Sequence, residues 1–405
     1  MGKKESGAVK EQRKILFQAA QNGSLDCLPR GLLIRNITKW SAYTPEQAQA
    51  TWDSRTLVQP ASLDSVLHVA ARNGNVNVIR SFYFYFSLSF FLEYLKLDYL
   101  LTSTNQDGKC ALHEAVQALQ CEVSQYLIDR GTPVDVLKRA DWTPLMLACT
   151  RSNNVSMVKL LLQNGARTDL RNKDGWTPFH ICTRKGNLES LKILLAHDPF
   201  LLNTKSYNGR TPLHTAAIHG HSEIVRFIVS ACRLNGQLVN AQDSCGSTPL
   251  MDAARFNSVE CCDILIGHGA AIDKRDGVGR NAFHIAAQAG STEVIRYFLG
   301  VMGASVKKTN SIESRLDNYK ASTKNTRNGN DVHVNTVHWR TDNGQTVLHL
   351  AAREGHVDTV KYLLSIGANI EVKDCENYTA MDIARRYKND QILETLNEHR
   401  DKTLK

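Results

Sequence analysis

Apolar and polar residues follow one another along much of the chain with the spacing of short helices arranged in pairs. In one copy, Thr177 is placed to cap a helix, and Pro178 follows at the first helical position, where a missing N–H costs nothing. Gly186 is placed to end this short helix. The next segment, Leu188–Ala196, carries leucine or isoleucine at 188, 191, 193, 194 and 195, which is helical spacing. The pattern predicts two short helices that cannot bury an apolar core alone.

The same pattern recurs nine times. Phrases such as CALHEAV, TPFHICT, TPLHTAA and NAFHIAA repeat, and their key apolar residues are 45, 33, 34, 34, 37, 33, 65 and 33 residues apart. A period near 33 with the phrase T-P-L-H is typical of ankyrin repeats, so the chain resembles the ankyrin-repeat family over nearly its whole length. The resemblance implies an all-α solenoid of about nine helix-turn-helix repeats with β-hairpin-like fingers and a degenerate N-terminal cap. The key residues are Leu67, Leu112, Leu145, Phe179, Leu213, Leu250, Phe283, Leu348 and Met381.

Departures from the period divide the chain into segments. Residues 1–12 are expected to form a disordered N-terminus, and residues 13–61 a degenerate capping repeat with an irregular connector. Ankyrin repeats then occupy 62–305 and resume over 341–405, where the charged last repeat suits a solvent-facing cap. Between them, residues 306–340 are polar and basic and are expected to be disordered, either as a tolerated surface insertion or as a regulatory or tethering segment.

A second insert, residues 81–90 with the sequence SFYFYFSLSF, is apolar and does not fit the repeat. Its removal restores a normal second helix. Such a run is what a pyrimidine-rich intron end encodes when translated, so it is either a gene-model artefact or an exposed aromatic patch for docking or aggregation. The apolar stretch from Phe82 to Leu92 has eleven residues, against about twenty for a membrane span, so no membrane crossing is expected.

Charge, cysteine and histidine narrow the chemistry. The net charge of +9 favours an acidic partner, although the basic residues are spread along the chain. Cys149 and Cys182 stand where sister repeats carry alanine, which predicts buried apolar thiols in a reducing compartment. Six histidines share one slot of the repeat, and because they lie one repeat apart they cannot converge on a metal, so we expect hydrogen bonds to backbone between repeats. These are His68, His113, His180, His214, His284 and His349. No cofactor loop or nucleophile–base pattern is seen, so neither a cofactor nor an ordinary enzyme is expected.

A finer resemblance covers Asn105 to Leu299. The runs VDVLKRADWTPLMLACTR, LRNKDGWTPFHI and GRTPLHTAAIHGH, with tryptophan where most ankyrin repeats carry a small polar residue, resemble the ankyrin repeat domain-containing protein 16 family. That resemblance implies a protein of cytoplasm and nucleus that binds the catalytic domain of alanyl-tRNA synthetase. It would accept misactivated serine on its own lysines and so limit mischarging of alanine tRNA. The alternative is a passive ankyrin-repeat scaffold with another protein partner. A monomer is expected in both cases, and a weak contact of the basic insert with tRNA is left open.

The resemblance also implies acceptor lysines on or near successive fingers of the central repeats. Lys173 matches one of them; Arg139 stands at another, with Lys138 beside it; and Asn203 stands at the third, with Lys205 two residues on. Neighbouring cations or desolvation would lower the pKa of such a lysine and increase its neutral, nucleophilic fraction. Each of Lys173, Lys138 and Lys205 could instead be a solvated finger charge.

Four finger residues are candidates for partner binding. Aromatic and arginine side chains are the commonest energetic centres of protein interfaces, which selects Trp142, Trp176, Tyr207 and Arg210. For the two tryptophans the alternative is packing between fingers, because large aromatics also dominate buried contacts.

Overall fold

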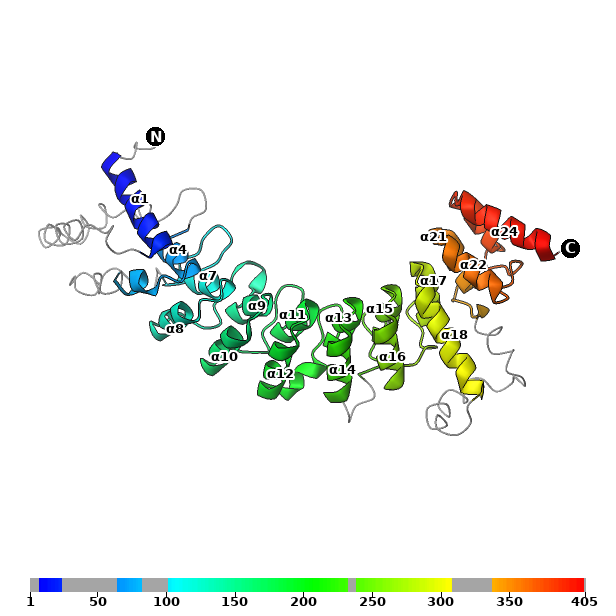
Figure 1. Cartoon of the computed structure of the whole chain (residues 1–405), viewed down its shortest axis with the longest axis horizontal. Coiled ribbons are helices and arrows are strands. Elements are labelled where there is room, and N and C mark those ends of the chain that lie inside the picture. The colour runs from blue at the N-terminus through cyan, green and yellow to red at the C-terminus, as the bar shows by residue number, and fades with distance from the viewer. Residues whose placement is uncertain (1–6, 24–63, 82–100, 232–237, 308–336, 404–405) are drawn as a thin grey trace, which may run out of the picture. The chain divides into compact units, whose positions relative to one another are not determined.

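Short helices in pairs make up the regular structure. The computed structural model describes residues 7–23, 64–81, 101–231, 238–307 and 337–403, and the regular elements in these residues are helices, as the repeat pattern predicts (Figure 1). The backbone separates into two compact units, Met1–Leu201 and Leu202–Lys405. The predictions for residues 24–63 and 82–90, and for most of the insert at 306–340, fall outside the described residues.

Each repeat contributes a first and a second helix. Within a unit, first helices pack on first helices of the adjoining repeats, and second helices pack on second helices (Figure 1). The first unit contains α1 (Gly7–Asn22), α4 (Val66–Arg72), a helical turn at 76–81, α7 (Ala111–Gln117), α8 (Cys121–Asp129), α9 (Pro144–Cys149), α10 (Val155–Gln163), α11 (Pro178–Lys185) and α12 (Leu188–His197). The second contains α13 (Pro212–Ile218), α14 (Ser222–Ala231), α15 (Pro249–Arg255), α16 (Val259–Gly267), α17 (Ala282–Ala289), α18 (Thr292–Lys307), α21 (Val347–Glu354), α22 (Val357–Ser365), α23 (Ala380–Arg386) and α24 (Asp390–Thr403).

The pair α11 and α12 shows why these residues form helices. Thr177 is the N-cap of α11, Pro178 is its first residue, and Gly186 ends it at φ 78°, a left-handed conformation that glycine adopts without a side-chain clash. Helix α12 begins at Leu188, as the apolar stripe predicts, and extends to His197. The predicted start, stop and pairing are confirmed because caps and breakers act within a few residues of the chain.

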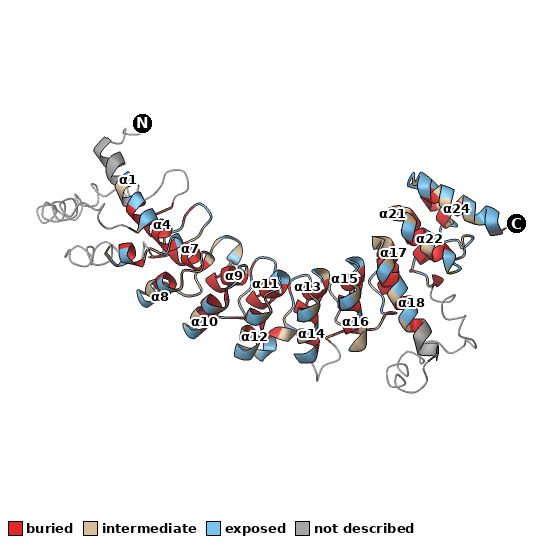
Figure 2. Ribbon diagram, in the orientation of Figure 1, coloured by how far each residue is buried: buried red, intermediate tan, exposed pale blue. Residues whose placement is uncertain are grey.

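First and second helices differ in how completely their neighbours cover them. All six residues of α9 are buried, whereas α12 buries only Ser190, Leu191 and Leu194 (Figure 2). Complete burial of a leucine side chain contributes about 2 kcal/mol. Because the cover of each first helix comes from adjacent repeats, the stability of a repeat depends on the repeat beside it.

Two predicted boundaries need correction. Helix α1 begins at Gly7, so the expectation of a disordered N-terminus over 1–12 is wrong for residues 7–12. The sequence AVKEQRK is rich in good helix formers, which extend the helix ahead of its apolar residues. At the other boundary, α18 continues to Lys307 and Val337 is buried, so both ends of the predicted insert belong to the flanking repeats.

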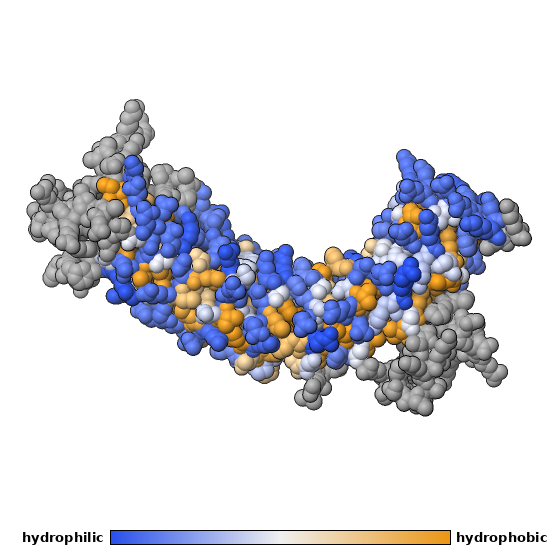
Figure 3. Space-filling view, in the orientation of Figure 1, coloured by the Kyte–Doolittle hydropathy of each residue, from blue (hydrophilic) through white to orange (hydrophobic). Residues whose placement is uncertain are grey.

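No helix among the described residues is both long enough and apolar enough for a bilayer crossing. On the face shown in Figure 3, apolar side chains lie in short stretches between polar ones along the repeats.

Candidate functional site

The fingers that precede the first helices are five-residue loops, here called finger loops. In each of them the backbone N–H of the first residue donates to the carbonyl of the fifth, as from Asn172 to Trp176 at 3.1 Å. Finger loops occur at 105–109, 138–142 and 172–176 in the first unit, and at 206–210, 243–247, 276–280, 341–345 and 374–378 in the second.

The first residue of a finger loop usually accepts hydrogen bonds through its side chain. Asn172 Oδ1 accepts from the N–H groups of Asp174 at 3.0 Å and Trp176 at 2.9 Å. Side-chain oxygens of Asn105, Ser206, Asp243, Asp276, Thr341 and Asp374 accept from their own loops in the same way. These acceptors satisfy backbone donors that the tight turn would otherwise leave without partners.

Lys138 is the exception among the eight described finger loops. Lysine has no acceptor, so the side-chain bonds that close the other loops cannot form here. The fourth position of this loop holds Asp141 at φ 61°, and Ala140 beside it lies at φ 64°, both in the left-handed region. For a non-glycine residue that conformation costs about 1 kcal/mol or more. The loop therefore departs from the repeat in both hydrogen bonding and backbone conformation.

The Lys138 side chain lies over the ring of Trp142, with Nζ 5.3 Å from the ring centroid. Both residues are half-buried. Burial lowers the pKa of Lys138, and the positive charge of Lys109 lowers it further, against the opposing effect of Asp107. Within the described residues Lys138 makes no salt bridge. The amine is thus held partly out of water beside a second cation.

Lys109 is fixed near this site by carboxylates. Its Nζ lies 3.5 Å from Asp107 Oδ2 and 3.4 Å from Glu114 Oε1. Glu114 is buried, and its other oxygen accepts from Arg72 Nε at 2.9 Å. These contacts fix the Lys109 ammonium at a position from which its charge acts on Lys138.

Trp176 carries a cation in the same manner. Arg184 Cζ lies 5.3 Å from the Trp176 ring centroid, and the ring stacks on His180 with centroids 6.4 Å apart. Trp142 and Trp176 therefore pack against side chains of their own unit while each stays half-exposed. Packing and partner contact, the two alternatives for these tryptophans, are compatible in this geometry. The spatial pairing of tryptophan with a cation was missed from sequence, although Lys138 and Trp142 are only four residues apart.

The predicted lysines do not all come together. Lys173 is exposed, and its backbone N–H donates to Ala140 O at 3.1 Å, which places it on the finger loop adjacent to that of Lys138. Arg139 is exposed and packs on Gly108, where a Cβ would stand 2.8 Å from Arg139 Cγ. Lys205 is exposed and lies in the second unit, two residues ahead of Tyr207. Of the three predicted lysines, Lys138 and Lys173 therefore lie on neighbouring finger loops of the first unit, whereas Lys205 lies in the second unit.

The two remaining candidates differ in character. Tyr207 is 68% exposed, which suits a contact with a partner. Arg210 is instead committed to its own unit, because its Nε lies 3.3 Å from Asp243 Oδ2 and its Nη2 3.7 Å from Asp252 Oδ1. Asp252 is buried, and burial raises its pKa to about 7.

The histidine slot is structural, as predicted. Each first-helix histidine accepts at Nδ1 from the residue that caps its helix, as His214 does from Thr211 N–H at 3.2 Å. In four of the six, Nε2 then reaches a carbonyl at the following finger, whereas the buried His113 Nε2 has no hydrogen-bond partner in the described structure. The distances are 2.7 Å for His68 to Lys109 O, 3.0 Å for His214 to Ser247 O, 3.0 Å for His284 to Trp339 O and 3.2 Å for His349 to Tyr378 O. In the described residues, metal-ligating side chains do not gather in groups of three or more.

The described cysteines are free, and Cys149 and Cys182 are buried as expected. Burial raises the pKa of Cys182 well above its ordinary value, with the Cys149 thiol as a further cause. Both behave as small apolar side chains of the repeat interior.

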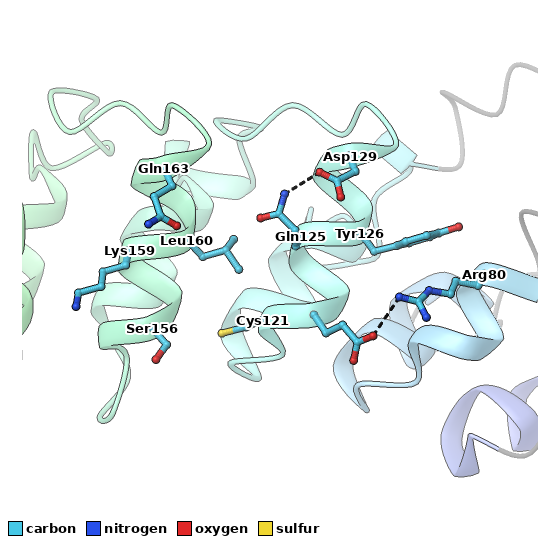
Figure 4. A pocket seen from close by; sticks show the side chains of 10 residues that line it. Arg80, Cys121, Gln125, Tyr126, Asp129, Ser156, Lys159, Leu160 and Gln163 are labelled. Carbon is cyan, nitrogen blue, oxygen red and sulfur yellow. Dashed lines mark hydrogen bonds and ion pairs between the residues drawn. The ribbon is translucent and has the colours of Figure 1, made fainter.

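A shallow groove of about 610 Å³ lies between α8 and α10 (Figure 4). Arg80 reaches its edge and donates to Glu122 at 3.1 Å, while Gln125 donates to Asp129 at 2.7 Å. The side chains that line the groove include two acids, Glu122 and Asp129, and two bases, Arg80 and Lys159. The groove is open to solvent. It offers a small ligand neither enclosure nor one sign of charge.

The finger loops of the two units differ in their balance of basic and acidic side chains. The three loops of the first unit carry four basic and three acidic side chains, whereas the five described loops of the second carry two basic and five acidic ones. Leu137, next to Lys138, is 52% exposed. The finger loops of the first unit therefore carry a small excess of basic side chains and two half-exposed tryptophans, with the exposed Leu137 beside them.

Comparison with known proteins agrees with this architecture. A family model of ankyrin repeats (three copies) matches residues 67–172, 145–237, 230–310 and 317–405. E3 ubiquitin-protein ligase XBAT33 of Arabidopsis thaliana is 33% identical over 157 residues, which is 38% of this chain and 30% of that protein. E3 ubiquitin-protein ligase XBAT32 of the same plant is 34% identical over 159 residues, with the same coverage of 38% and 30%. Inversin of Homo sapiens is 30% identical over 171 residues, 40% of this chain and 16% of that protein.

The matched regions cover at most 30% of these relatives, so the ligase activity in two of the names stays with those proteins. What the comparisons share with this chain is the repeat, which binds protein partners and is not itself an enzyme fold. The family model covers most of the chain, and the helix pairs and finger loops follow the same period. The chain therefore belongs to the ankyrin-repeat family.

Proposed function

We propose that this ankyrin-repeat protein binds the catalytic domain of alanyl-tRNA synthetase in cytoplasm and nucleus, and accepts misactivated serine on finger lysines of its first unit. The proposal rests on the resemblance of Asn105–Leu299 to the ankyrin repeat domain-containing protein 16 family. The observation that best supports it is the adjacency of Lys138 and Lys173 on neighbouring finger loops, beside two half-exposed tryptophans.

Docking and acceptance would use different groups of this surface. Half-exposed Trp142 and Trp176 supply contact area with few rotatable bonds, and the cations over their rings suit an acidic partner face. A lysine amine held beside an enzyme-bound adenylate needs no general base of its own, because proximity supplies much of the rate. An open surface without an enclosed pocket suffices for this role.

The test combines capture with labelling. Purified chain is incubated with alanyl-tRNA synthetase, ATP and labelled serine, and the label on each lysine is located by peptide mass spectrometry. We expect co-purification with the synthetase and serine on Lys138 or Lys173. The double variant Lys138→Arg, Lys173→Arg keeps both charges and should lose the label while binding persists. Lys274→Arg, at an exposed lysine of the second unit, is the matched control and should label as the parent does.

A passive scaffold is the second candidate. Arg139 and Asn203 stand at two family lysine positions, and neither can form a stable amide with serine in this way. Synthetase binding without serine on any lysine would support binding alone. Failure to capture the synthetase at all would contradict the proposal and leave a scaffold for a different protein.

The basic insert raises a separate proposal, that the complex also contacts tRNA weakly. Neutralisation of phosphates by lysine and arginine releases counterions, so such a contact would weaken steeply with added salt. Affinity for tRNA that does not change with salt would contradict it.

A further inference from the structure

We infer that Lys138 is the reactive amine of the first unit, a site of covalent acylation by activated acyl groups such as acyl phosphates and acyl adenylates. The assignment of serine as its natural acyl group rests on the proposed function, whereas the reactivity of the site does not. Three features of the finger loop 138–142 support the inference.

The first feature is the position of Lys138 in its loop. The other seven described finger loops place Asn, Asp, Ser or Thr there, and each of those side chains accepts a hydrogen bond from its own loop. A lysine gives up those bonds and brings an ammonium to a half-buried position. The contact of the ammonium with the Trp142 ring replaces part of this stabilisation. A departure from the repeat that gives up stabilising hydrogen bonds is the kind expected at a functional site.

The second feature is backbone conformation. Ala140 and Asp141 both lie in the left-handed region, where six other finger loops have glycine at the fourth position. Lys138 N–H still donates to Trp142 O at 3.0 Å, and Asp141 N–H donates to Lys138 O at 3.1 Å. These bonds close the loop while it carries two non-glycine residues in a costly conformation, and strain of this kind is concentrated at functional sites.

The third feature is the surroundings of the amine. Nζ lies 5.3 Å from the Trp142 ring centroid, and within the described residues no carboxylate forms a salt bridge with it. Lys109, the nearby cation, is held in place by Asp107 and Glu114. The Trp142 ring and the Asp107 carboxylate favour the charged ammonium, whereas partial burial and the positive charge of Lys109 favour the uncharged amine and lower the Lys138 pKa. Lys173 is exposed on the adjacent loop and is the natural internal reference.

The chemistry is a simple acyl transfer. Lys138 first releases a proton to solvent, and the free amine attacks the carbonyl carbon of the mixed anhydride. A C–N bond forms, the C–O bond to the phosphate breaks, and the phosphate or AMP leaves with the bonding electron pair. The second amine proton is lost to solvent, which leaves a neutral amide. The reaction needs no oxidant, metal or further reactant.

The test uses the full chain and acetyl phosphate as the probe, so it does not depend on any synthetase. Acetylation of Lys138 and Lys173 is followed over time by peptide mass spectrometry, at limiting probe concentration and at several pH values. We expect Lys138 to be acetylated several-fold faster than Lys173 near pH 7, with the ratio falling toward one as pH approaches 10. Equal rates at the two lysines near pH 7, or a ratio that does not change with pH, would overturn the inference.

A variant separates reactivity from a structural role. Lys138→Asn restores the side-chain acceptor of the other finger loops, so it should raise the urea midpoint of unfolding and leave labelling of Lys173 unchanged. A lowered midpoint would show that Lys138 stabilises the loop and would count against the inference. The serine experiment then distinguishes the two proposals: preferential acetylation of Lys138 without synthetase-dependent serine contradicts only the proposed function. Serine on Lys173 with no preference for Lys138 toward acetyl phosphate contradicts only the inference.

Discussion

Asp252 and Glu114 occupy the same position in the first helices of two repeats, where other repeats bury an apolar or hydroxyl side chain. Glu114 receives hydrogen bonds from Arg72 and Asn105 and an ion pair from Lys109. Asp252 is equally buried, but in the described structure neither of its oxygens accepts a hydrogen bond, and its nearest cation is Arg210 at 3.7 Å. A buried carboxylate without hydrogen bonds is costly, so the two acids have opposite effects on stability.

The consequence for Asp252 can be measured. Its folded-state pKa of about 7 lies above the ordinary value of 3.8, so the folded state holds the proton more tightly and loses stability as pH rises from about 4 to 7. The variant Asp252→Asn carries no such charge. We expect it to increase the free energy of unfolding by on the order of 3 kcal/mol at pH 8, and by much less at pH 5.

Urea unfolding of parent and variant at the two pH values checks this difference. Glu114→Gln is the matched control and should destabilise the chain at pH 8, because it removes a partner from Arg72 and Lys109. An equal gain for Asp252→Asn at both pH values would contradict the role given to ionisation.

At the scale of the element, six first helices begin with a cap that includes a histidine of the repeat. His214 Nε2 must donate to Ser247 O, since a carbonyl can only accept, so Nδ1 carries no proton and accepts from Thr211. Protonation would place a second N–H against these donors. Burial lowers the pKa of His113, His214 and His284 to about 4.

This geometry predicts acid sensitivity. The unfolded state binds protons on these histidines below about pH 6.5, whereas the folded state resists until about pH 4, so stability falls as pH decreases through that window. Each of the three histidines should lose roughly 2 kcal/mol of stabilisation between pH 7 and pH 5. In the variant His214→Met, which copies Met146 and Met251 in the same slot, the free energy of unfolding should change less between pH 7 and pH 5, by about that amount, and the urea midpoint should depend less on pH. A midpoint of His214→Met that falls as steeply as the parent's would rule out this contribution.

The helices and the histidine role could be predicted from sequence because both follow from residues within one period. Thr177, Pro178 and Gly186 act on their own helix, and the repetition of His214 and its counterparts indicates that they do the same work in each repeat. The state of Lys138 could not be predicted in this way. The difference between Lys138 and the first residues of the other finger loops is visible only once the loops are aligned on the hydrogen bond from their first N–H to their fifth carbonyl. The position of its amine over Trp142 and near Lys109 depends on the tertiary structure. Similarly, the sequence does not show that Asp252 lacks hydrogen-bond donors, because this depends on side chains from other repeats.

For the molecule as a whole, the net charge is +9, but the charged side chains of the finger loops are distributed unevenly between the two units. The loops of the first unit combine basic side chains with Trp142 and Trp176, while the second unit has Asp at the first position of three loops, at 243, 276 and 374. An acidic partner should therefore contact the first unit. Long-range attraction of this kind raises the association rate and is screened within about 10 Å at 0.1 M salt.

Charge reversal at matched lysines tests this assignment. Lys173→Glu, in a finger loop of the first unit, should slow association with the captured partner several-fold at low salt, and the difference from the parent should shrink as salt is raised, because exposed charges are screened. Lys274→Glu makes the same change at an exposed lysine of the second unit and should alter the rate little. Association rates measured by surface plasmon resonance across a salt series give both comparisons. If the two variants slow association equally, the field of the whole chain guides the partner and the first unit has no special part in it. If neither does, the partner is recognised without electrostatic attraction, and the half-exposed tryptophans would then account for its binding.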